Sequence, residues 1–263
     1  MIVYVQGVGV LGPGFAGWSD TAKTLAGTED FVATPVSLPA IAALPAAERR
    51  RTGAVVKLAV GVGLEALAQA RFDPSEMATV FSSSGADGDT IHAILEVLTT
   101  GDCQISPTRF HNSVHNAPSG YWALACEATA PSTSLCGFDG SFSMGLLDAA
   151  AQVCVDNRPV TLISYDHPYP EPLHAARLLH NIFAVSLVLT PQRTADSLAE
   201  LRISTRKSDA SGSSMSNPQV EAIRRDNPAA RSLPLLEALA TSGGDVAIEG
   251  MERMLVDVMV TRF

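Results

Sequence analysis

The sequence predicts an α/β fold in which strands and helices alternate along the chain. Its central segment carries most of this prediction. Residues 132–136 alternate small polar and apolar side chains as a buried strand does, residues 137–141 form a sharp turn, and residues 144–155 have helical periodicity. Two apolar runs, residues 159–165 and 182–189, are typical of buried strands. The hydrophobic content of 46% is sufficient for a substantial core.

Near the N-terminus, a predicted strand at residues 2–6 is followed by the pattern G-x-G-x-x-G at residues 7–12. A dinucleotide-binding site requires a helix that begins within this pattern and an acidic residue at the end of a second strand. Pro13 and Gly14 interrupt such a helix. We therefore expect a strand-to-loop turn that uses glycine, with a dinucleotide site as the weaker alternative.

The other elements continue the alternation. Residues 46–70 form the longest predicted helix, because one helical face collects the apolar residues Val55, Leu58, Ala59, Val62 and Ala66. Further helices are expected at residues 18–25, from about 89 to 98, at 117–128 and 229–240, strands at 77–81, 201–205 and 254–260, loops at 34–45, 82–88 and 107–115, and a flexible Gly/Ser-rich segment at 208–217.

The chain is acidic, with a formal net charge of −9 at pH 7. Binding to nucleic acid or to an anionic membrane needs a basic surface, so we expect neither partner. Residues 49–51, three consecutive arginines, are interpreted as a solvated helix face. The sequence has no run of about 18 apolar residues, and its N-terminus lacks the pattern of a signal peptide. These features predict a cytoplasmic protein without a membrane span.

The chain has four cysteines, which are scattered without a Cys-x-x-Cys pair: Cys103, Cys126, Cys136 and Cys154. We expect buried free thiols and no disulfide or zinc site. His111 and His115 are four residues apart, but they precede the helix at residues 117–128 and have no third ligand nearby. The sequence therefore predicts no metal site and no bound cofactor.

The predicted strand, turn and helix place Asp139 where many enzymes carry a nucleophile. Such a turn lifts one side chain to a helix N-terminus, where backbone N–H groups and the helix dipole favour negative charge. From its residue type alone, Asp139 is interpreted as a capping or dipole-stabilised carboxylate, and a residual chemical role is the weaker alternative.

Three stretches resemble a known family: PTRFHNSVHNAPSGYW at residues 107–122, SFSMGLLDAA at 141–150 and VQGVGVLGPG at 5–14. They are similar to the N-terminal half of β-ketoacyl synthases, in the thiolase superfamily. The closest likeness is to the short chain-length-factor branch found with aryl polyene and xanthomonadin-type pigment clusters. The resemblance implies a truncated thiolase-like layered fold with a mixed central sheet. It also implies one ketosynthase-like domain over residues 1–263, whose part after about residue 190 is shortened and divergent.

In active ketosynthases a Gly-Pro pair opens the strand, and the acyl-accepting cysteine follows it at a fixed spacing. The resemblance places Ala130 and Pro131 on that pair, which brings Asp139 to the nucleophile position. Active members also carry two catalytic histidines in their second half, whereas the last histidine of this chain is His180. The resemblance therefore implies no catalytic residue here and a catalytically inactive chain length factor.

The resemblance also implies partners. A chain length factor forms a heterodimer with a full-length, active ketosynthase and helps to set the length of the product, and acyl carrier protein is reached through that ketosynthase. A bulky side chain that enters the partner's acyl tunnel acts as a steric ruler. The implied interface and tunnel residues are Arg109, Phe110, His111, Ser113, His115, Asn116, Tyr121, Trp122, Ser134 and Phe138. Core packing explains Tyr121 and Trp122 equally well.

Two alternatives remain at this point. The first is a serine hydrolase, because residues 141–145 miss the G-x-S-x-G pattern by one residue and Ser143 is followed by Asp166 and then His174 or His180 in hydrolase order. Against it, serine replaces the first glycine of the pattern, and no glycine-rich oxyanion loop is present. The second is an enzyme that binds acyl carrier protein or decarboxylates by itself, with Asp139 as a base.

Overall fold

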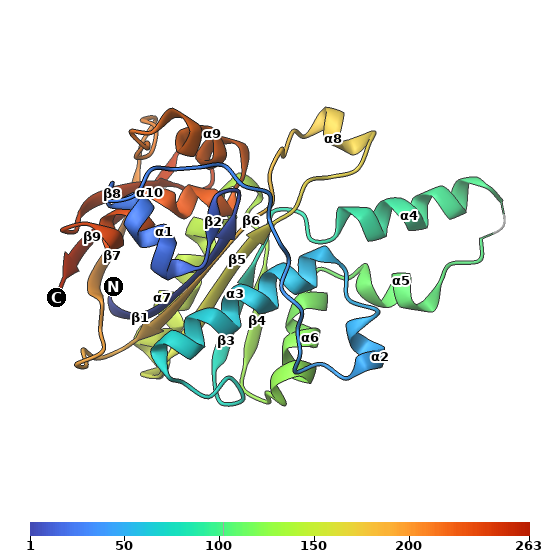
Figure 1. Cartoon of the computed structure of the whole chain (residues 1–263), viewed down its shortest axis with the longest axis horizontal. Helices are drawn as coiled ribbons and strands as arrows, with labels where there is room; N and C mark the ends of the chain where they lie inside the picture. Colours follow the sequence, from blue (N-terminus) through green and yellow to red (C-terminus); the bar gives the residue numbers. More distant parts are fainter. Residues whose placement is uncertain (102) are drawn as a thin grey trace.

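The computed structural model describes residues 1–101 and 103–263 and confirms the predicted α/β fold with a mixed sheet. In this part of the chain nine strands form one sheet in the order β4-β3-β5-β6-β1-β7-β9-β8, and β2 pairs with β1 (Figure 1). β3 is parallel to both β4 and β5, and the other pairs are antiparallel. The strands are β1 (Ile2–Gly12), β2 (Phe15–Ala16), β3 (Ala78–Ser82), β4 (Ser132–Leu135), β5 (Val160–Asp166), β6 (Phe183–Thr190), β7 (Ala199–Lys207), β8 (Gly244–Glu249) and β9 (Met254–Arg262).

Helices cover the sheet on both faces (Figure 1). They are α1 (Trp18–Leu25), α2 (Ala46–Arg49), α3 (Ala54–Ala70), α4 (Gly88–Thr99), α5 (Pro107–Asn112), α6 (Ala117–Cys126), α7 (Ser141–Asp156), α8 (Leu173–Ala176), α9 (Pro218–Asp226) and α10 (Leu233–Ala240), with 3₁₀ turns η1 (Phe138–Gly140) and η2 (Ala229–Ser232). None of these helices is long and apolar enough to cross a membrane over the described residues.

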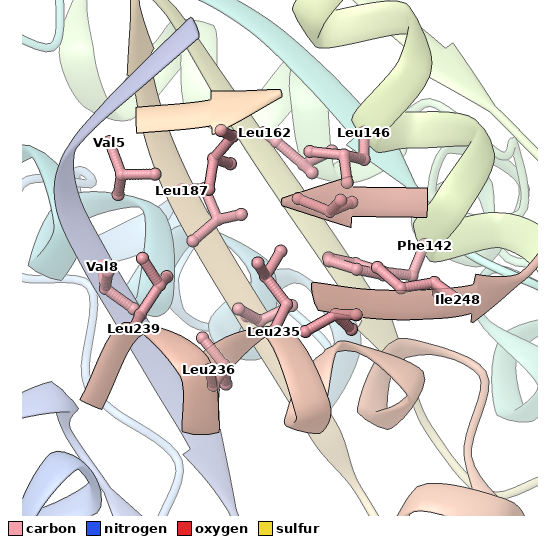
Figure 2. Packing of buried hydrophobic residues seen from close by; sticks show 14 of the residues in the cluster. Val5, Val8, Phe142, Leu146, Leu162, Leu187, Leu235, Leu236, Leu239 and Ile248 are labelled. Carbon is pink, nitrogen blue, oxygen red and sulfur yellow. The ribbon is translucent and has the colours of Figure 1, made fainter. Parts of the chain in front are cut away.

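The core has two parts because successive residues of a strand point to opposite faces of the sheet. Leu162 of β5 packs on the side of α7 and α10, where Figure 2 shows it with Leu187, Phe142 and Leu235. The next residue, Ile163, packs on the other side with the buried face of α3 and with α6. The apolar run of β5 is therefore buried on both faces, as its sequence predicts.

Strand β1 runs through all of the G-x-G-x-x-G pattern, so the predicted turn and the alternative dinucleotide site are both wrong. Its glycines let α3 pack directly on the strand, because a Cβ at Gly7 or Gly9 would lie 2.1 Å from a carbonyl oxygen of α3. Beyond Val5, β1 no longer pairs with β7. The freed N–H group of Val10 donates instead to the partly buried Glu65 of α3, at 3.1 Å, and desolvation raises the pKa of that carboxyl.

Helices α4 and α5 form an arm that projects from the body of the molecule (Figure 1). No residue of α4 is buried, although its apolar Ile91, Leu95 and Leu98 would favour burial. The predicted loop at residues 107–115 is wrong over its first six residues, which form α5. Pro107 at the start of α5 is a signal for a helix N-terminus that could have identified this short helix.

Other segments also differ from the sequence-based expectation. The long helix at residues 46–70 is interrupted after Arg49, because Gly53 adopts an extended conformation before α3. Helix α9 and strand β8 were not predicted. Helix α9 has the start signal of Asn217, whose side chain accepts from backbone N–H groups of the first turn, followed by Pro218. The expected strands at residues 201–205 and 254–260 lie within β7 and β9.

Strand β4 lies at one edge of the sheet and pairs only with β3. The prediction of a buried strand at residues 132–136 is therefore wrong: the side chains of β4 are partly or fully exposed, and Cys136 just beyond it is exposed. The expectation of buried thiols is also wrong for Cys103 and Cys154, which are exposed. Cys126 is partly buried, and desolvation raises the pKa of its thiol to about 11. Cys136 faces solvent because it follows β4, whose outer side is the edge of the sheet.

A buried carboxylate at the end of β5 joins this strand to the loop after β3 and to η2. Asp166 is 2% exposed, and its Oδ1 accepts hydrogen bonds from the backbone N–H of Ser84, at 2.8 Å, and from the Ser84 hydroxyl, at 2.6 Å. Its Oδ2 accepts from the backbone N–H of Ala229, at 3.1 Å. Burial raises the pKa of Asp166 to about 6, against the opposing effect of these hydrogen bonds. The carboxylate therefore fixes the loop after β3 and η2 to the end of β5.

We predict that Asp166 makes the stability of this protein depend on pH. Because its pKa in the folded state is raised to about 6, its stabilising contribution is complete below its ordinary pKa and is lost as the pH rises through about 6. A shift of about two units corresponds to about 3 kcal/mol in the free energy of unfolding. Asp166→Asn removes this slope, which urea unfolding between pH 4 and pH 7.5 measures. The exposed Asp30→Asn is the matched control. An unchanged slope in Asp166→Asn would contradict the assignment.

Candidate functional site

The turn between β4 and α7 holds Asp139 in an ion-pair cluster. Asp139 Oδ1 accepts from Arg177 Nη2 at 2.9 Å, and Asp139 Oδ2 lies 3.4 Å from Arg231 Nη2. Arg177 comes from the β5–β6 loop (residues 167–182), and Arg231 comes from η2. Both arginine side chains are less than one fifth exposed, with 18% for Arg177 and 19% for Arg231. The carboxylate therefore connects three segments that are distant in the sequence.

The capping role expected for Asp139 is not what the structure shows. The N-cap residue of α7 is Gly140. Among the described hydrogen bonds, the Asp139 carboxylate accepts from Arg177 and from no backbone N–H group of this turn. Ser141 satisfies the turn instead, because its hydroxyl oxygen accepts from the backbone N–H of Gly137 at 3.0 Å. Asp139 is thus free to pair with the two guanidinium groups. Its position beside the first turn of α7 still favours negative charge.

The residue before Asp139 has an unusual conformation. Phe138 has a positive φ of 50°, a region that an aromatic side chain rarely adopts, and it is 59% exposed. The guanidinium of Arg177 lies over its ring, with Cζ 3.7 Å from the ring centroid. Arg177 therefore contacts both Phe138 and Asp139. The ring is held on one side by this cation–π contact, whereas much of its surface faces solvent.

The structure does not assemble the hydrolase alternative. Ser143 is 1% exposed, and its hydroxyl lies 2.9 Å from the carbonyl oxygens of both Gly140 and Glu249. Asp166 bonds to Ser84 and Ala229, as described above. Among the described residues, no hydrogen bond joins Ser143, Asp166 and His174. A buried serine that is engaged with backbone carbonyls cannot attack an ester, so the hydrolase reading is wrong.

No histidine in residues 1–101 and 103–263 bonds to Asp139, whose partners are the two arginines. The histidines contact other groups: His92 pairs with Glu96 at 3.3 Å, His111 packs edge-on against Tyr121, His115 Nε2 lies 3.4 Å from the carbonyl oxygen of Ser83, His167 Nδ1 lies 3.8 Å from Asp89, and His174 packs edge-on against His180. The structure thus places two permanent cations beside Asp139 in place of groups that exchange protons near neutral pH.

Most residues that the resemblance assigns to an interface lie at the surface. On α5, Arg109 and His111 are exposed and Phe110 is 67% exposed. Asn116 is exposed before α6, whereas Ser113, His115 and the edge-strand residue Ser134 are partly exposed. Ser113 donates to the carbonyl oxygen of Phe110 at 2.8 Å, so it closes the end of α5. All of these residues except Ser134 lie between positions 109 and 116.

Tyr121 and Trp122 differ from the rest of that set. Each is 1% exposed and packs into the core between α3 and α6, as the alternative of core packing allowed. The Tyr121 hydroxyl donates to Asn112 Oδ1 at 3.0 Å, and desolvation raises its pKa. Tyr121 is also one of the residues that line a groove of ≈ 470 Å³ beside α5 and α6. Both side chains therefore stabilise the packing of α6 on α3 and offer little surface to another chain.

Sequence reasoning missed the two residues that define the site, Arg177 and Arg231. Arg177 lies 38 residues from Asp139 in a loop, and neither arginine belongs to a recognisable motif. A carboxylate at a turn before a helix predicts some cationic or N–H partner, but the partner's position depends on how the β5–β6 loop and η2 fold back. The sequence therefore identifies Asp139 but not the cluster around it.

Comparisons with known proteins identify the family and the fold of this chain. The family model for the N-terminal domain of β-ketoacyl synthases matches residues 18–253. A search of the curated proteins found no match. Among solved structures, a chain of the ketosynthase ApeO in complex with its chain length factor ApeC from Xenorhabdus doucetiae has a TM-score of 0.75 at 22% identity, over 98% of this chain and 99% of that chain.

Two further structures have the same fold. A chain of the complex AntDE:AntF, a type II polyketide ketosynthase with its acyl carrier protein, has a TM-score of 0.76 at 11% identity, over 100% of this chain and 99% of that chain. A chain of the ishigamide ketosynthase/chain length factor has a TM-score of 0.70 at 12% identity, over 100% and 99% of the two chains. The family model spans most of the sequence, and the chain therefore belongs to the β-ketoacyl synthase family through that family's N-terminal domain.

Proposed function

We propose that this chain is a catalytically inactive chain length factor, which pairs with a full-length, active β-ketoacyl-acyl carrier protein synthase and helps to set the length of its acyl or polyene product. The observation that carries the proposal is the ion-paired Asp139, at the position that the sequence resemblance assigns to the acyl-accepting cysteine of active ketosynthases. The aryl polyene type of pathway is proposed from the resemblance of the sequence, and a cytoplasmic location is proposed with it.

The chemistry of Asp139 supports inactivity. Condensation needs a nucleophile that carries the acyl chain as a stable thioester, whereas transfer to a carboxylate would form a reactive mixed anhydride. Both carboxylate oxygens of Asp139 are also engaged, one by Arg177 and the other by Arg231. The same engagement argues against Asp139 as a base in a decarboxylase that acts alone, because guanidinium groups occupy both carboxylate oxygens where a substrate proton would have to arrive.

The histidines support the same conclusion. In active ketosynthases, two histidines of the second half drive decarboxylation of the extender unit. Here all six histidines precede residue 181, and their contacts are with groups other than Asp139. A site without an acyl carrier and without proton-transfer groups cannot complete a condensation. The remaining role for a chain of this fold is structural, as a partner that shapes another active site.

The surface of the chain supports a ketosynthase partner. β4 is an edge strand with one unpaired side, α5 presents Phe110 to solvent, and α4 has no buried residue. Exposed strand edges and apolar helices of this kind are typical of surfaces that bind another chain. Because this chain and acyl carrier proteins are both acidic, we propose that the carrier protein docks mainly on the ketosynthase.

The direct test of the proposal is complex formation. We expect this chain, co-expressed with a full-length ketosynthase encoded beside it, to elute from gel filtration as a 1:1 heterodimer that forms polyene or polyketide products. The ketosynthase without this chain is expected to make products of altered length or none. A chain that stays separate from every such ketosynthase, or that turns over esters by itself, would overturn the proposal.

We predict that Asp139→Cys does not create a condensing enzyme. The measurement uses a heterodimer whose ketosynthase carries alanine in place of its own nucleophilic cysteine, so that any condensation must come from this chain. A cysteine at position 139 would still lack catalytic histidines, and it would leave Arg177 and Arg231 without their carboxylate. Product formation above that of the unchanged chain in the same heterodimer would contradict the account.

We predict that Phe110→Ala changes the product and not the stability of the chain. Phe110 is 67% exposed, so its loss should alter the free energy of unfolding by less than about 0.5 kcal/mol. Without the bulky ring in the partner's tunnel, the product distribution is expected to shift to longer chains or to broaden. The matched control is Val155→Ala, which removes an 81% exposed apolar side chain at the far end of α7. An unchanged distribution would exclude Phe110 from the ruler.

A further inference from the structure

Phe138 combines three features that a turn does not require. It is an aromatic residue at a positive φ of 50°, where glycine or asparagine would fit without strain. It exposes 59% of its surface, although its ring would be buried more favourably. Its ring is nevertheless fixed, because the guanidinium of Arg177 lies 3.7 Å from the ring centroid. Strain that persists at an exposed position is more common at functional sites than elsewhere.

Arg177, which holds the Phe138 ring, is itself held in place by an ion pair. Arg177 is 18% exposed and donates to Asp139 at 2.9 Å, while Asp139 is also paired with Arg231 of η2. The Nε atom of Arg177 is buried and has no hydrogen-bond partner among the described residues, so the guanidinium is held mainly by Asp139 and Phe138. Asp139 therefore orients Arg177, and Arg177 orients Phe138.

The place of Phe138 in the fold indicates what it contacts. It lies three residues beyond β4, the edge strand whose free side continues the sheet surface, and Cys136 between them is exposed. An aromatic ring backed by an arginine has the composition of an interface hot spot, where a rigid anchor loses little conformational entropy on binding. A ring that is ordered before binding is preorganised for one partner surface.

We infer that Phe138 is an anchor for the ketosynthase partner, and that Asp139 is a positioning residue which holds the anchor through Arg177. This inference rests on the proposed function, since it takes its partner from there. It assigns a positive role to the residue at the nucleophile position. The carboxylate orders the surface that the partner meets, because it pairs with two guanidinium groups at once, whereas neither asparagine nor cysteine carries a negative charge and a second oxygen for both.

The test measures the affinity of the purified full chain for the full-length ketosynthase. Phe138→Ala is expected to weaken binding by about tenfold or more and to leave the melting temperature of the isolated chain unchanged or higher. The matched control is Phe263→Ala, because Phe263 is 46% exposed and also lies under an arginine, Arg193, at 3.4 Å. Figure 1 shows the C-terminus on the side of the molecule away from the α4–α5 arm. The control is expected to bind as tightly as the unchanged chain.

A double-mutant cycle separates positioning from folding. Asp139→Asn is expected to weaken partner binding by about threefold in the unchanged chain and to have no further effect in the Phe138→Ala background, because its action passes through the ring. Equal losses in both backgrounds would assign Asp139 a purely structural role and overturn its part of the inference. Binding by Phe138→Ala within about twofold of the unchanged chain would overturn the anchor. If the unchanged chain binds no ketosynthase, the proposed function fails first, and the inference fails with it.

Discussion

The carboxylate of Asp139, held between Arg177 and Arg231, is the interaction on which the rest of the site depends. It joins three segments that are separate in the sequence: the turn after β4, the β5–β6 loop and η2. The site keeps a strand, a turn and a helix in sequence, and the group at the turn is an anion with two fixed counter-ions. The chain belongs to the β-ketoacyl synthase family through its N-terminal domain, and the paired anion at this turn underlies the proposed role as a subunit that organises a surface.

The scaffold below this site is fixed by direct packing and by a second buried carboxylate. Helix α3 contacts the backbone of β1 through Gly7 and Gly9, and this close contact sets the helix against one face of the sheet. At the end of the interior strand β5, Asp166 binds the loop after β3 and the first residue of η2. The turn η2 therefore has two contacts: its Ala229 N–H group donates to the buried Asp166, and its Arg231 pairs with Asp139 near the surface.

Local patterns predicted the parts of the fold that depend on local periodicity. The buried strand β5, the helix α7 and the strand-turn-helix around Asp139 were predictable because their apolar spacing is regular. The arm formed by α4 and α5 and the ion-pair cluster around Asp139 were not predictable from local periodicity. Helix α5 is too short for a periodic signal, the exposure of Cys136 follows from the edge position of β4, and Arg177 reaches Asp139 only through the path of a loop. A pattern along the chain identifies one member of a site, while its partners depend on tertiary structure.

The central claim is that this chain shapes a product without carrying it, and one measurement tests that claim most directly. Mass spectrometry of both subunits, taken from the assembled heterodimer during turnover with loaded acyl carrier protein, locates the acyl chain. The account predicts acyl adducts on the nucleophilic cysteine of the ketosynthase and an unmodified mass for this chain, with its exposed Cys136 unacylated. An acyl group attached to the turn at residues 136–141 of this chain, accumulating and then disappearing at the rate of product formation, would contradict it.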